Sequence, residues 1–460
     1  MKKSQRQLII QFSLLFLVFF FFAIFRFYNL DKRIIFDWDQ ERDANIIKQL
    51  LVDHKLTLIG PRVVSESGFF LGPYFTYLLA PFYLLTNLHP QGLIYFIIFY
   101  NIIFFAFSYL ILKKIYGLNQ SLGFLFLWAI NFLLVEYDVI PWNSILIPLG
   151  VVMTWLFLYR IFKNNATEDW FLLGLVLGFF GNMHFQFIFM ILFSAFFLVL
   201  YQIKKKAFDL KKIFVAKLSF LAMFIPLLIF DLRHNFINGK QFINFFFTNL
   251  NKNVFDPFAW IPVLTNFFYP LLLIKNTLLT VVFYLLLITT NVVLIKRSKN
   301  FFKIFYLSSL ILLVITPIFF ILYGKRPSEY YFLYLYPFIF ILLIQFFLKF
   351  KAVRILYLLV LLNLIFSYGH LKRILKVNLL GLLYKDKIVT TIKKDLGNRS
   401  SDISRDLGIG RDTGFGYLID YYKLNKRKGK VTDQVQIRFP PQKHDLIIGE
   451  YGINYSWQNK

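Results

Sequence analysis

Residues 8–28 read LIIQFSLLFLVFFFFAIFRFY, a stretch with no acidic residue. Because a helix rises roughly 1.5 Å per residue, about 20 such residues cross the apolar part of a bilayer, so this stretch predicts a membrane-spanning helix. It follows Lys2, Lys3 and Arg6. It is also too long for the apolar part of a signal peptide and lacks a small-residue cleavage site. We therefore expect a retained anchor whose N-terminus stays in the cytoplasm.

Further apolar runs of this kind, separated by charged clusters, follow along the 460-residue chain. The eleven expected spans are residues 8–28, 92–112, 119–138, 143–162, 170–183, 185–203, 213–232, 277–295, 303–323, 330–348 and 352–370. The composition agrees, because 58% of the residues are hydrophobic and only 16% are charged. Such values exclude an ordinary cytosolic enzyme. The sequence predicts an all-α polytopic membrane protein with about 11 transmembrane helices.

The 51 basic residues outnumber the 24 acidic ones and give a net charge of +27. Basic residues such as Lys113, Lys114 and Lys204 gather in the segments that this topology places in the cytoplasm, as the positive-inside rule requires. Nucleic-acid binding is therefore not needed to explain the charge. An odd number of spans places the C-terminus outside the cell membrane. Cysteine is absent, which excludes disulfides, thiolate metal sites and cysteine nucleophiles.

The predicted organisation has two parts. Residues 1–370 form the transmembrane domain, with a long first extracytoplasmic loop at residues 29–91 that carries juxtamembrane helices. A second outer loop, residues 233–276, contains an apolar stretch from Phe258 to Ile274 that predicts a half-helix or re-entrant segment. Residues 371–460 combine short apolar runs with glycine and proline turn signals, which predicts a small extracytoplasmic α+β domain.

The densest acidic site follows the first span, where residues 36–44 read FDWDQERDA. Asp37 and Gln40 have the spacing of a helix-capping box, and apolar residues then recur at helical intervals at positions 44, 47 and 51. This pattern predicts a helix that lies on the membrane surface.

Asp39 would lie in the first turn of this helix, where the backbone dipole stabilises a carboxylate. An ionised carboxylate at that place suits a general base. The alternative interpretation is that the acids, Asp37, Glu41 and Asp43 above all, only cap and solubilise the helix.

Asp39, Arg42 and Ala44 resemble the first-loop motif of the GT-C glycosyltransferases, specifically the branch of protein mannosyltransferases and aminoarabinose transferases. Four further segments of the membrane portion and one of the tail also resemble motifs of that family, namely residues 72–81, 141–143, 181–184, 231–236 and 412–417. In one respect the chain departs from the family. The basic residue that precedes the proline of the juxtamembrane helix is replaced here by Leu71 or Gly72, so its phosphate contact must pass to another cation.

The resemblance implies the GT-C fold and an enzyme that moves a sugar, a hexose or a pentose, from a polyprenyl-phosphate donor to an extracytoplasmic acceptor. The acceptor is a glycan, lipid or protein, and the anomeric carbon is inverted. One base and an anion clamp suffice for this reaction, whereas a glycosidase needs a paired acid and base. The protein would lie in the plasma membrane among membrane lipids.

The expected site residues divide by role. The catalytic candidates are Asp39, Glu41 and Asp138. The candidates for binding the donor phosphate are Arg233, Arg42, Tyr74 and Tyr330, with Lys325, Arg326 and Tyr331 as weaker ones. The candidates for binding substrate are Asp37, Trp142, Asn143, His184 and His234.

Several of these residues also fit plain structural roles. In a structural role, the Arg233 side chain would reach the lipid head groups from a helix end, and His184 would pack in the protein interior. Asp138 suits a boundary residue or a partner that steadies Arg42. The tyrosines near Tyr330 suit an interfacial aromatic belt.

No obligatory cofactor or metal is expected. Two acids with His184 or His234 could hold a divalent ion, but no tight ligand spacing such as HExxH occurs. A nucleotide-sugar donor is disfavoured because no GxGxxG or P-loop pattern is present. Two other function classes stay open, a lipid-linked sugar flippase or transporter and a non-catalytic membrane protein of envelope assembly. A transporter would favour charges in mid-membrane and internal symmetry, neither of which is evident.

Overall fold

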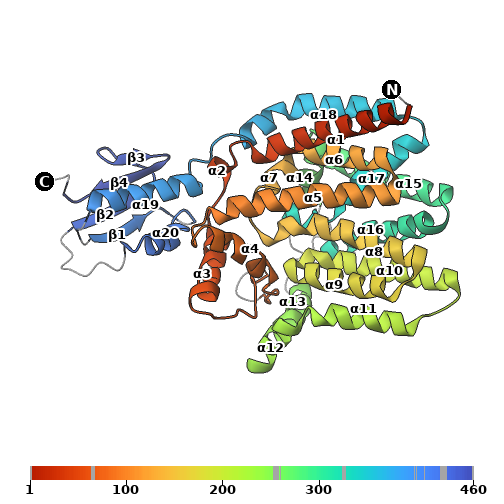
Figure 1. Cartoon of the computed structure of the whole chain (residues 1–460), viewed down its shortest axis with the longest axis horizontal. Helices are drawn as coiled ribbons and strands as arrows, with labels where there is room; N and C mark the ends of the chain where they lie inside the picture. The colour runs from red at the N-terminus through yellow and green to blue at the C-terminus, as the bar shows by residue number, and fades with distance from the viewer. Residues whose placement is uncertain are drawn as a thin grey trace.

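The computed structural model describes residues 3–63, 68–251, 258, 261–323, 328–397, 399, 401–408, 410–424 and 433–457. Its larger part is a bundle of roughly parallel and antiparallel helices, and its smaller part lies at one end of that bundle (Figure 1). The bundle helices are α1 (Lys3–Phe27), α5 (Gly92–Tyr116), α6 (Leu118–Ile130), α7 (Phe132–Tyr137), α8 (Ile147–Asn164), α9 (Thr167–Met183), α10 (Ile188–Lys205), α11 (Leu210–Ala222), α12 (Ile225–Arg233), α14 (Ile261–Leu272), α15 (Thr277–Arg297), α16 (Asn300–Tyr323), α17 (Leu335–Lys349) and α18 (Val353–Ile374).

Every expected span coincides with helix, and the chain is a multi-pass membrane protein. Among the described residues, seven helices are long and apolar enough to cross a bilayer, and the bent pair α11 and α12 makes up to eight. The predicted number of eleven is therefore not confirmed. The span expected at residues 119–138 is broken at Asn131, whose side chain caps α7 by accepting the backbone N–H of Leu134. The segment expected to be a half-helix contains α14, which is 12 residues long.

The outer surface of the bundle is apolar, as a bilayer requires. Phe12 and Phe16 of α1 and Phe366 of α18 are each about two-thirds exposed. Large side chains such as Trp128 and Trp155 are fully buried between the helices. A patch of exposed aromatic side chains this large is stable only against an apolar surrounding.

The first loop forms α2 (Leu30–Arg33), α3 (Trp38–Val52) and α4 (Tyr74–Leu85), and α13 (Ile237–Asn251) follows α12. Helix α3 is the helix that the acidic motif predicts. The capping box is present, with the Asp37 backbone N–H donating to Gln40 Oε1 at 3.0 Å, and Ala44 and Ile47 are buried. Short 3-10 turns, η1 (Asn143–Leu146), η2 (Phe185–Phe187) and η3 (Glu329–Phe332), precede α8, α10 and α17.

The C-terminal part is α+β, as predicted. Helices α19 (Leu382–Leu396) and α20 (Phe415–Tyr421) pack with a sheet of β1 (Ser401–Asp406), β2 (Asp433–Arg438), β3 (Leu446–Ile448) and β4 (Tyr451–Tyr455). The strand order is β1-β2-β4-β3, with β1 parallel to β2 and the other pairs antiparallel. This part lies at the end of the bundle opposite the start of α1, next to α2 and α3 (Figure 1).

A buried ion pair joins the first span to the segment that leads into η1. Arg26 donates to Asp138 Oδ2 from Nε at 2.9 Å and from Nη2 at 2.6 Å, and Trp128 Nε1 donates to the same oxygen at 2.9 Å. Arg26 also reaches the carbonyl oxygens of Trp128 and Ala129, while Asn101 holds the Asp138 carbonyl. Helices α1, α5 and α6 are thereby fixed to the outer end of α7.

This geometry predicts a stability effect. Replacing Asp138 by Asn removes the charge and leaves the Arg26 guanidinium buried without a counter-ion, which typically costs about 3–5 kcal/mol. We expect the detergent-solubilised variant to unfold at a clearly lower temperature than the wild-type protein. Glu136→Gln, at an exposed acid two residues earlier, is the matched control. Equal thermal unfolding of both variants and the wild type would contradict a structural role for the pair.

Candidate active site

A small cavity of about 130 Å³ lies where the first loop meets the ends of the bundle helices near α3. It brings together seven residues that the sequence singled out, which are Asp39, Arg42, Trp142, Asn143, His184, Tyr330 and the weaker candidate Tyr331. They come from α3, η1 with the residue before it, the residue after α9, and η3, segments far apart in the chain. Its lining is completed by Pro61, Arg62, Val63, Leu71 and Ser144.

Asp39 lies in the first turn of α3, as predicted, with its side chain 56% exposed. Arg42 Nη1 donates to Asp39 Oδ1 at 2.7 Å, and the same guanidinium donates to Asp43 Oδ1 from Nε and Nη2. Asp43 is buried, and burial raises its pKa to about 6 even though Arg42 opposes the rise. Two carboxylates thus fix the Arg42 side chain, and one of them, Asp39, faces the cavity.

His184 enters the cavity as a neutral ring. Burial lowers the pKa of His184 to about 3. Its Nδ1 accepts the backbone N–H of Gln186 at 3.2 Å, so the ring proton resides on Nε2 and is available to donate. The rings of Tyr330 and Tyr331 pack against it with centroids 5.6 Å and 5.2 Å away.

Trp142 and Tyr330 supply further donors. The two rings contact each other with centroids 4.8 Å apart. Trp142 Nε1 is buried and has no hydrogen-bond partner within the described part of the chain. Burial raises the pKa of Tyr330, and the charge of Asp39 adds to the rise, so the phenol keeps its proton. Asn143 lines the cavity while its amide donates to the carbonyl of Met183.

Arg62 is the residue that the sequence reasoning missed. It lies on a hairpin-like loop in which Arg62 bridges Phe70, and its Nε donates to the Gly68 carbonyl at 2.8 Å. In the amide orientation that satisfies both neighbours, Gln241 Oε1 accepts from Arg62 Nη2 at 2.7 Å. A signal existed, because Arg62 is the only lysine or arginine between Lys55 and Lys113.

The motif at residues 231–236 supports this loop from a distance. Asp231 accepts the backbone N–H groups of Asn238 and Gly239 at 2.7 and 2.9 Å. Asn238 in turn accepts from the Phe70 N–H at 2.6 Å and donates to the Phe70 carbonyl at 3.2 Å. Arg233 and His234, which we expected at the donor phosphate and the substrate, are exposed and do not line the cavity.

The remaining acidic candidates are bound elsewhere. Asp37 accepts from Lys385 Nζ at 2.6 Å. Glu41 accepts the backbone N–H of Gly414 and of Tyr417, both at 2.7 Å, and so holds the start of α20. Asp138 is committed to Arg26 and not to Arg42. None of these three carboxylates lines the cavity.

Tyr74 does not line the cavity either, because its hydroxyl donates to the Met223 carbonyl at 2.7 Å. Tyr334 and Tyr336 are fully buried, so the interpretation as an interfacial belt is wrong for these two. The weaker candidates Lys325 and Arg326 lie outside the described residues.

The motifs at residues 72–81 and 181–184 meet in space. The backbone of Gly72 lies so close to Asn182 that an added Cβ would fall 2.2 Å from Asn182 Oδ1, which only glycine avoids. Asn182 Nδ2 donates to the carbonyls of Gly178 and Met223. This contact fixes the start of α4 against the end of α9, on the side of the cavity where Leu71 and His184 lie.

Among the described residues no group of three or more His, Asp or Glu side chains is placed to hold a metal ion. The expectation of a metal-independent site stays a prediction. The lining instead offers one carboxylate, two guanidinium groups and several N–H and O–H donors. Such a set can accept one proton and bind an anion.

Residues 71–230 match the family model of the dolichyl-phosphate-mannose-protein mannosyltransferases. No curated protein matches the chain in sequence.

Solved structures share the fold. ArnT from Cupriavidus metallidurans bound to undecaprenyl phosphate superposes with a TM-score of 0.57 at 12% identity, over 98% of both chains. Its apo form gives the same TM-score at 10% identity and the same coverage. The oligosaccharyltransferase of Archaeoglobus fulgidus, in complex with Zn and sulfate, gives 0.51 at 12% identity, over 92% of this chain and 68% of its own. The family model over residues 71–230 and the fold shared along the whole chain confirm the predicted resemblance to the GT-C glycosyltransferases.

Proposed function

We propose that the chain transfers a sugar from a polyprenyl-phosphate donor to an extracytoplasmic acceptor, with Asp39 as the general base. The observation that carries the proposal is the cavity in which Asp39 lies together with Arg42, Arg62 and the donors of Trp142 and Tyr330. The ligand of one fold relative points the same way, since that ArnT structure is bound to undecaprenyl phosphate.

Asp39 takes the proton from the acceptor hydroxyl or amine as that atom bonds to the anomeric carbon. The bond between the anomeric carbon and the phosphate oxygen breaks, and the electron pair leaves with the polyprenyl phosphate. Among the described residues that line the cavity, Asp39 is the only carboxylate. With Asp39 acting as the base, no other described carboxylate of the lining is left to act as a nucleophile, so the proposed step is a direct displacement with inversion.

Arg62 and Arg42 bind the departing phosphate. A guanidinium donates two parallel hydrogen bonds to phosphate oxygens and stays charged. Arg62 lies beside Leu71 in the cavity lining. Because Leu71 stands where the family has its phosphate-binding cation, Arg62 makes the phosphate contact in its place. His184 and Tyr330, both uncharged donors, are placed for the hydroxyl groups of the sugar.

The prenyl chain occupies the apolar cavity beside the site. This cavity measures about 480 Å³ and is lined by side chains of α4, α5, α8 and α9 with η1. The two cavities share η1, which contributes Asn143 to the polar cavity and Leu146 to the apolar one, and His184 of the polar cavity directly follows α9. A donor that spans both places its phosphate near Arg62 and its tail in the membrane. The flippase and scaffold alternatives gain no support from a site of this kind.

The topology that fits this reaction has the N-terminus in the cytoplasm and the C-terminal domain outside. Asp39 and Arg42 of α3 line the cavity, and α3 lies at the end of the bundle where the C-terminal part packs (Figure 1). The start of α1, at Lys3, lies at the other end (Figure 1). An acceptor therefore reaches the site from the side of the C-terminal domain.

Replacing Asp39 by Asn removes the base while preserving size. Because a positioned general base typically contributes 10²- to 10⁴-fold, we expect the transfer rate in membranes supplied with lipid-linked sugar to fall by at least about 100-fold. Asp53→Asn, at the exposed C-terminal end of α3, is the matched control and should leave the rate unchanged. Near-normal turnover by Asp39→Asn at normal expression would refute the proposed role.

Replacing Arg62 by Gln removes the cation but keeps a hydrogen-bonding side chain. Charged hydrogen bonds contribute about 1.5–3 kcal/mol, so we expect the KM for the polyprenyl-phosphate donor to rise roughly 10- to 100-fold. Arg62→Lys should recover part of the loss. The assay is initial rate against donor concentration at saturating acceptor, and an unchanged donor KM in Arg62→Gln would exclude the phosphate contact.

Glu41 is a positioning residue, because it holds the tail against the helix that carries Asp39. Replacing Glu41 by Ala leaves two N–H groups of α20 without their acceptor, and we expect α20 to loosen and kcat to fall while donor KM stays near its wild-type value. The measurement pairs kinetics with amide hydrogen exchange at residues 414–421. Unchanged exchange there would show that Glu41 does not hold the tail. Glu41→Gln keeps one acceptor oxygen but sets an NH2 group against the second backbone N–H, so it should recover only part of the protection.

A further inference from the structure

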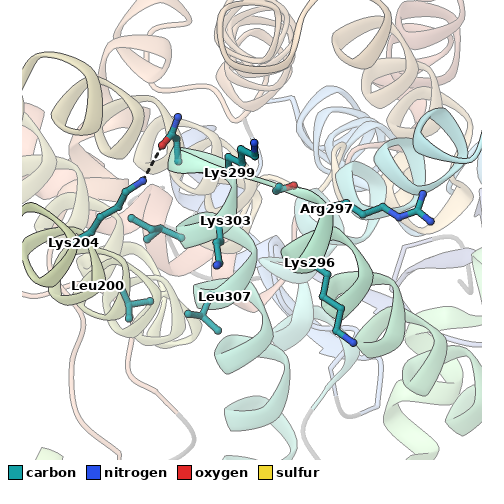
Figure 2. Close-up of a pocket in the computed structure, with 10 residues that line it drawn as sticks. Leu200, Lys204, Lys296, Arg297, Lys299, Lys303 and Leu307 are labelled. Atoms are coloured by element: carbon teal, nitrogen blue, oxygen red, sulfur yellow. Dashed lines mark hydrogen bonds between the residues drawn. The ribbon is translucent and has the colours of Figure 1, made fainter.

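A basic cavity lies at the opposite end of the bundle from the candidate active site. It measures about 630 Å³ and is formed where α10 ends, α15 ends and α16 begins. Five cations line it, which are Lys204, Lys296, Arg297, Lys299 and Lys303. The figure shows Lys204 of α10 and Lys303 of α16 on facing sides of the space (Figure 2).

No carboxylate lines this cavity, and none of its five cations forms an ion pair with a described acidic residue. Like charges this close repel one another, and an anion in the cavity relieves that repulsion. The positive-inside rule explains why cations occur at this end of the helices. It does not require cations from three helix ends to surround one hollow.

Two of the cations are held in place by neutral partners. Lys204 Nζ donates to Asn300 Oδ1 at 2.9 Å, the contact drawn in Figure 2. The Arg297 guanidinium lies over the Phe350 ring, 4.5 Å from the ring centroid. The backbone carbonyl of Arg297 accepts a hydrogen bond from Lys349 Nζ at 3.0 Å. These contacts orient the side chains without neutralising their charge, so the cavity keeps its full positive potential.

The same cavity has an apolar side. Leu200, Ile304 and Leu307 complete the lining. Leu200 precedes Lys204 by one helical turn and Leu307 follows Lys303 by one turn, so both lie roughly 5–6 Å further from the helix ends, toward the membrane interior. Figure 2 shows these leucines beside the cations. A phosphate at the surface joined to hydrocarbon below it matches this layering.

We propose that this cavity binds a membrane lipid with a phosphate-bearing anionic head group. Lys204, Lys299 and Lys303 contact the phosphate, while Leu200, Ile304 and Leu307 contact the first carbons of the acyl chains. The site is separate from the candidate active site, and the inference does not depend on the proposed glycosyl transfer. Basic hollows between membrane helices on the inner side are a known way of binding anionic lipids.

The test uses the full chain in nanodiscs or detergent and measures lipid binding by native mass spectrometry. The probes are phosphatidylglycerol, phosphatidylcholine of the same acyl chains, and inorganic phosphate. We expect phosphatidylglycerol to bind at least about tenfold more tightly than phosphatidylcholine. In the double variant Lys204→Gln with Lys303→Gln that affinity should fall by roughly tenfold or more, since each cation near a membrane surface contributes about fivefold.

The matched control is Lys113→Gln with Lys114→Gln, two lysines at the end of α5 that do not line the cavity. Its phosphatidylglycerol affinity should stay within about twofold of the wild type. Should the first double variant fold poorly, Lys299→Gln in the turn between α15 and α16 replaces it, with a loss of roughly fivefold expected.

Three outcomes overturn the proposal. Equal affinity for the two lipids excludes a head-group site. An equal loss in both double variants reduces the effect to the general positive charge of this face. Displacement of bound lipid by inorganic phosphate at the same low concentration as lipid identifies a free-phosphate site in place of a lipid site.

Discussion

The ion pair between Arg26 and Asp138 is the constraint on which the outer end of the bundle depends. A cation near the end of an apolar span is costly unless its charge is matched, and here one carboxylate and two carbonyl groups match it fully. The pair fixes the first span to the residues that lead into η1. Because η1 carries Asn143 and follows Trp142, the wall of the active-site cavity is set by an interaction that itself lies outside it.

The four carboxylates at the start of α3 each have a different role. Asp37 binds Lys385, Glu41 holds the start of α20, and Asp43 fixes Arg42 from its buried side. Asp39 alone of the four lines the cavity. The C-terminal part contacts α3 through the backbone N–H of Gly414. Glycine suits this position because its φ is +84° and because the Phe36 carbonyl oxygen leaves no room for a Cβ atom. A base held on such a helix keeps its position without being buried itself.

Features that depend on neighbouring residues can be predicted from this sequence, whereas contacts between distant residues cannot. The capping box at Asp37 and Gln40, the apolar face of α3 and the mixed α+β tail were predictable because each depends on neighbours within one or two turns. The span count is not confirmed where helices break, as at Asn131, because a cap inside an apolar run leaves mean hydropathy unchanged. Arg26 and Asp138 are 112 residues apart, so spacing in the sequence does not predict their pairing, and the sequence alone makes Asp138 a catalytic candidate.

In the proposed function, tertiary structure moves the phosphate contact to another residue. The family pattern pointed to a cation just before Pro73, and the chain has none there. The loop of Arg62 folds back so that residue 62 pairs with residue 70 and borders Leu71 at the cavity wall. Asp231 and Asn238 support that fold-back, so the motif that contains Arg233 also orders the loop that carries Arg62. A short loop that folds back on itself can thus place a guanidinium at a site where the neighbouring sequence has no cation.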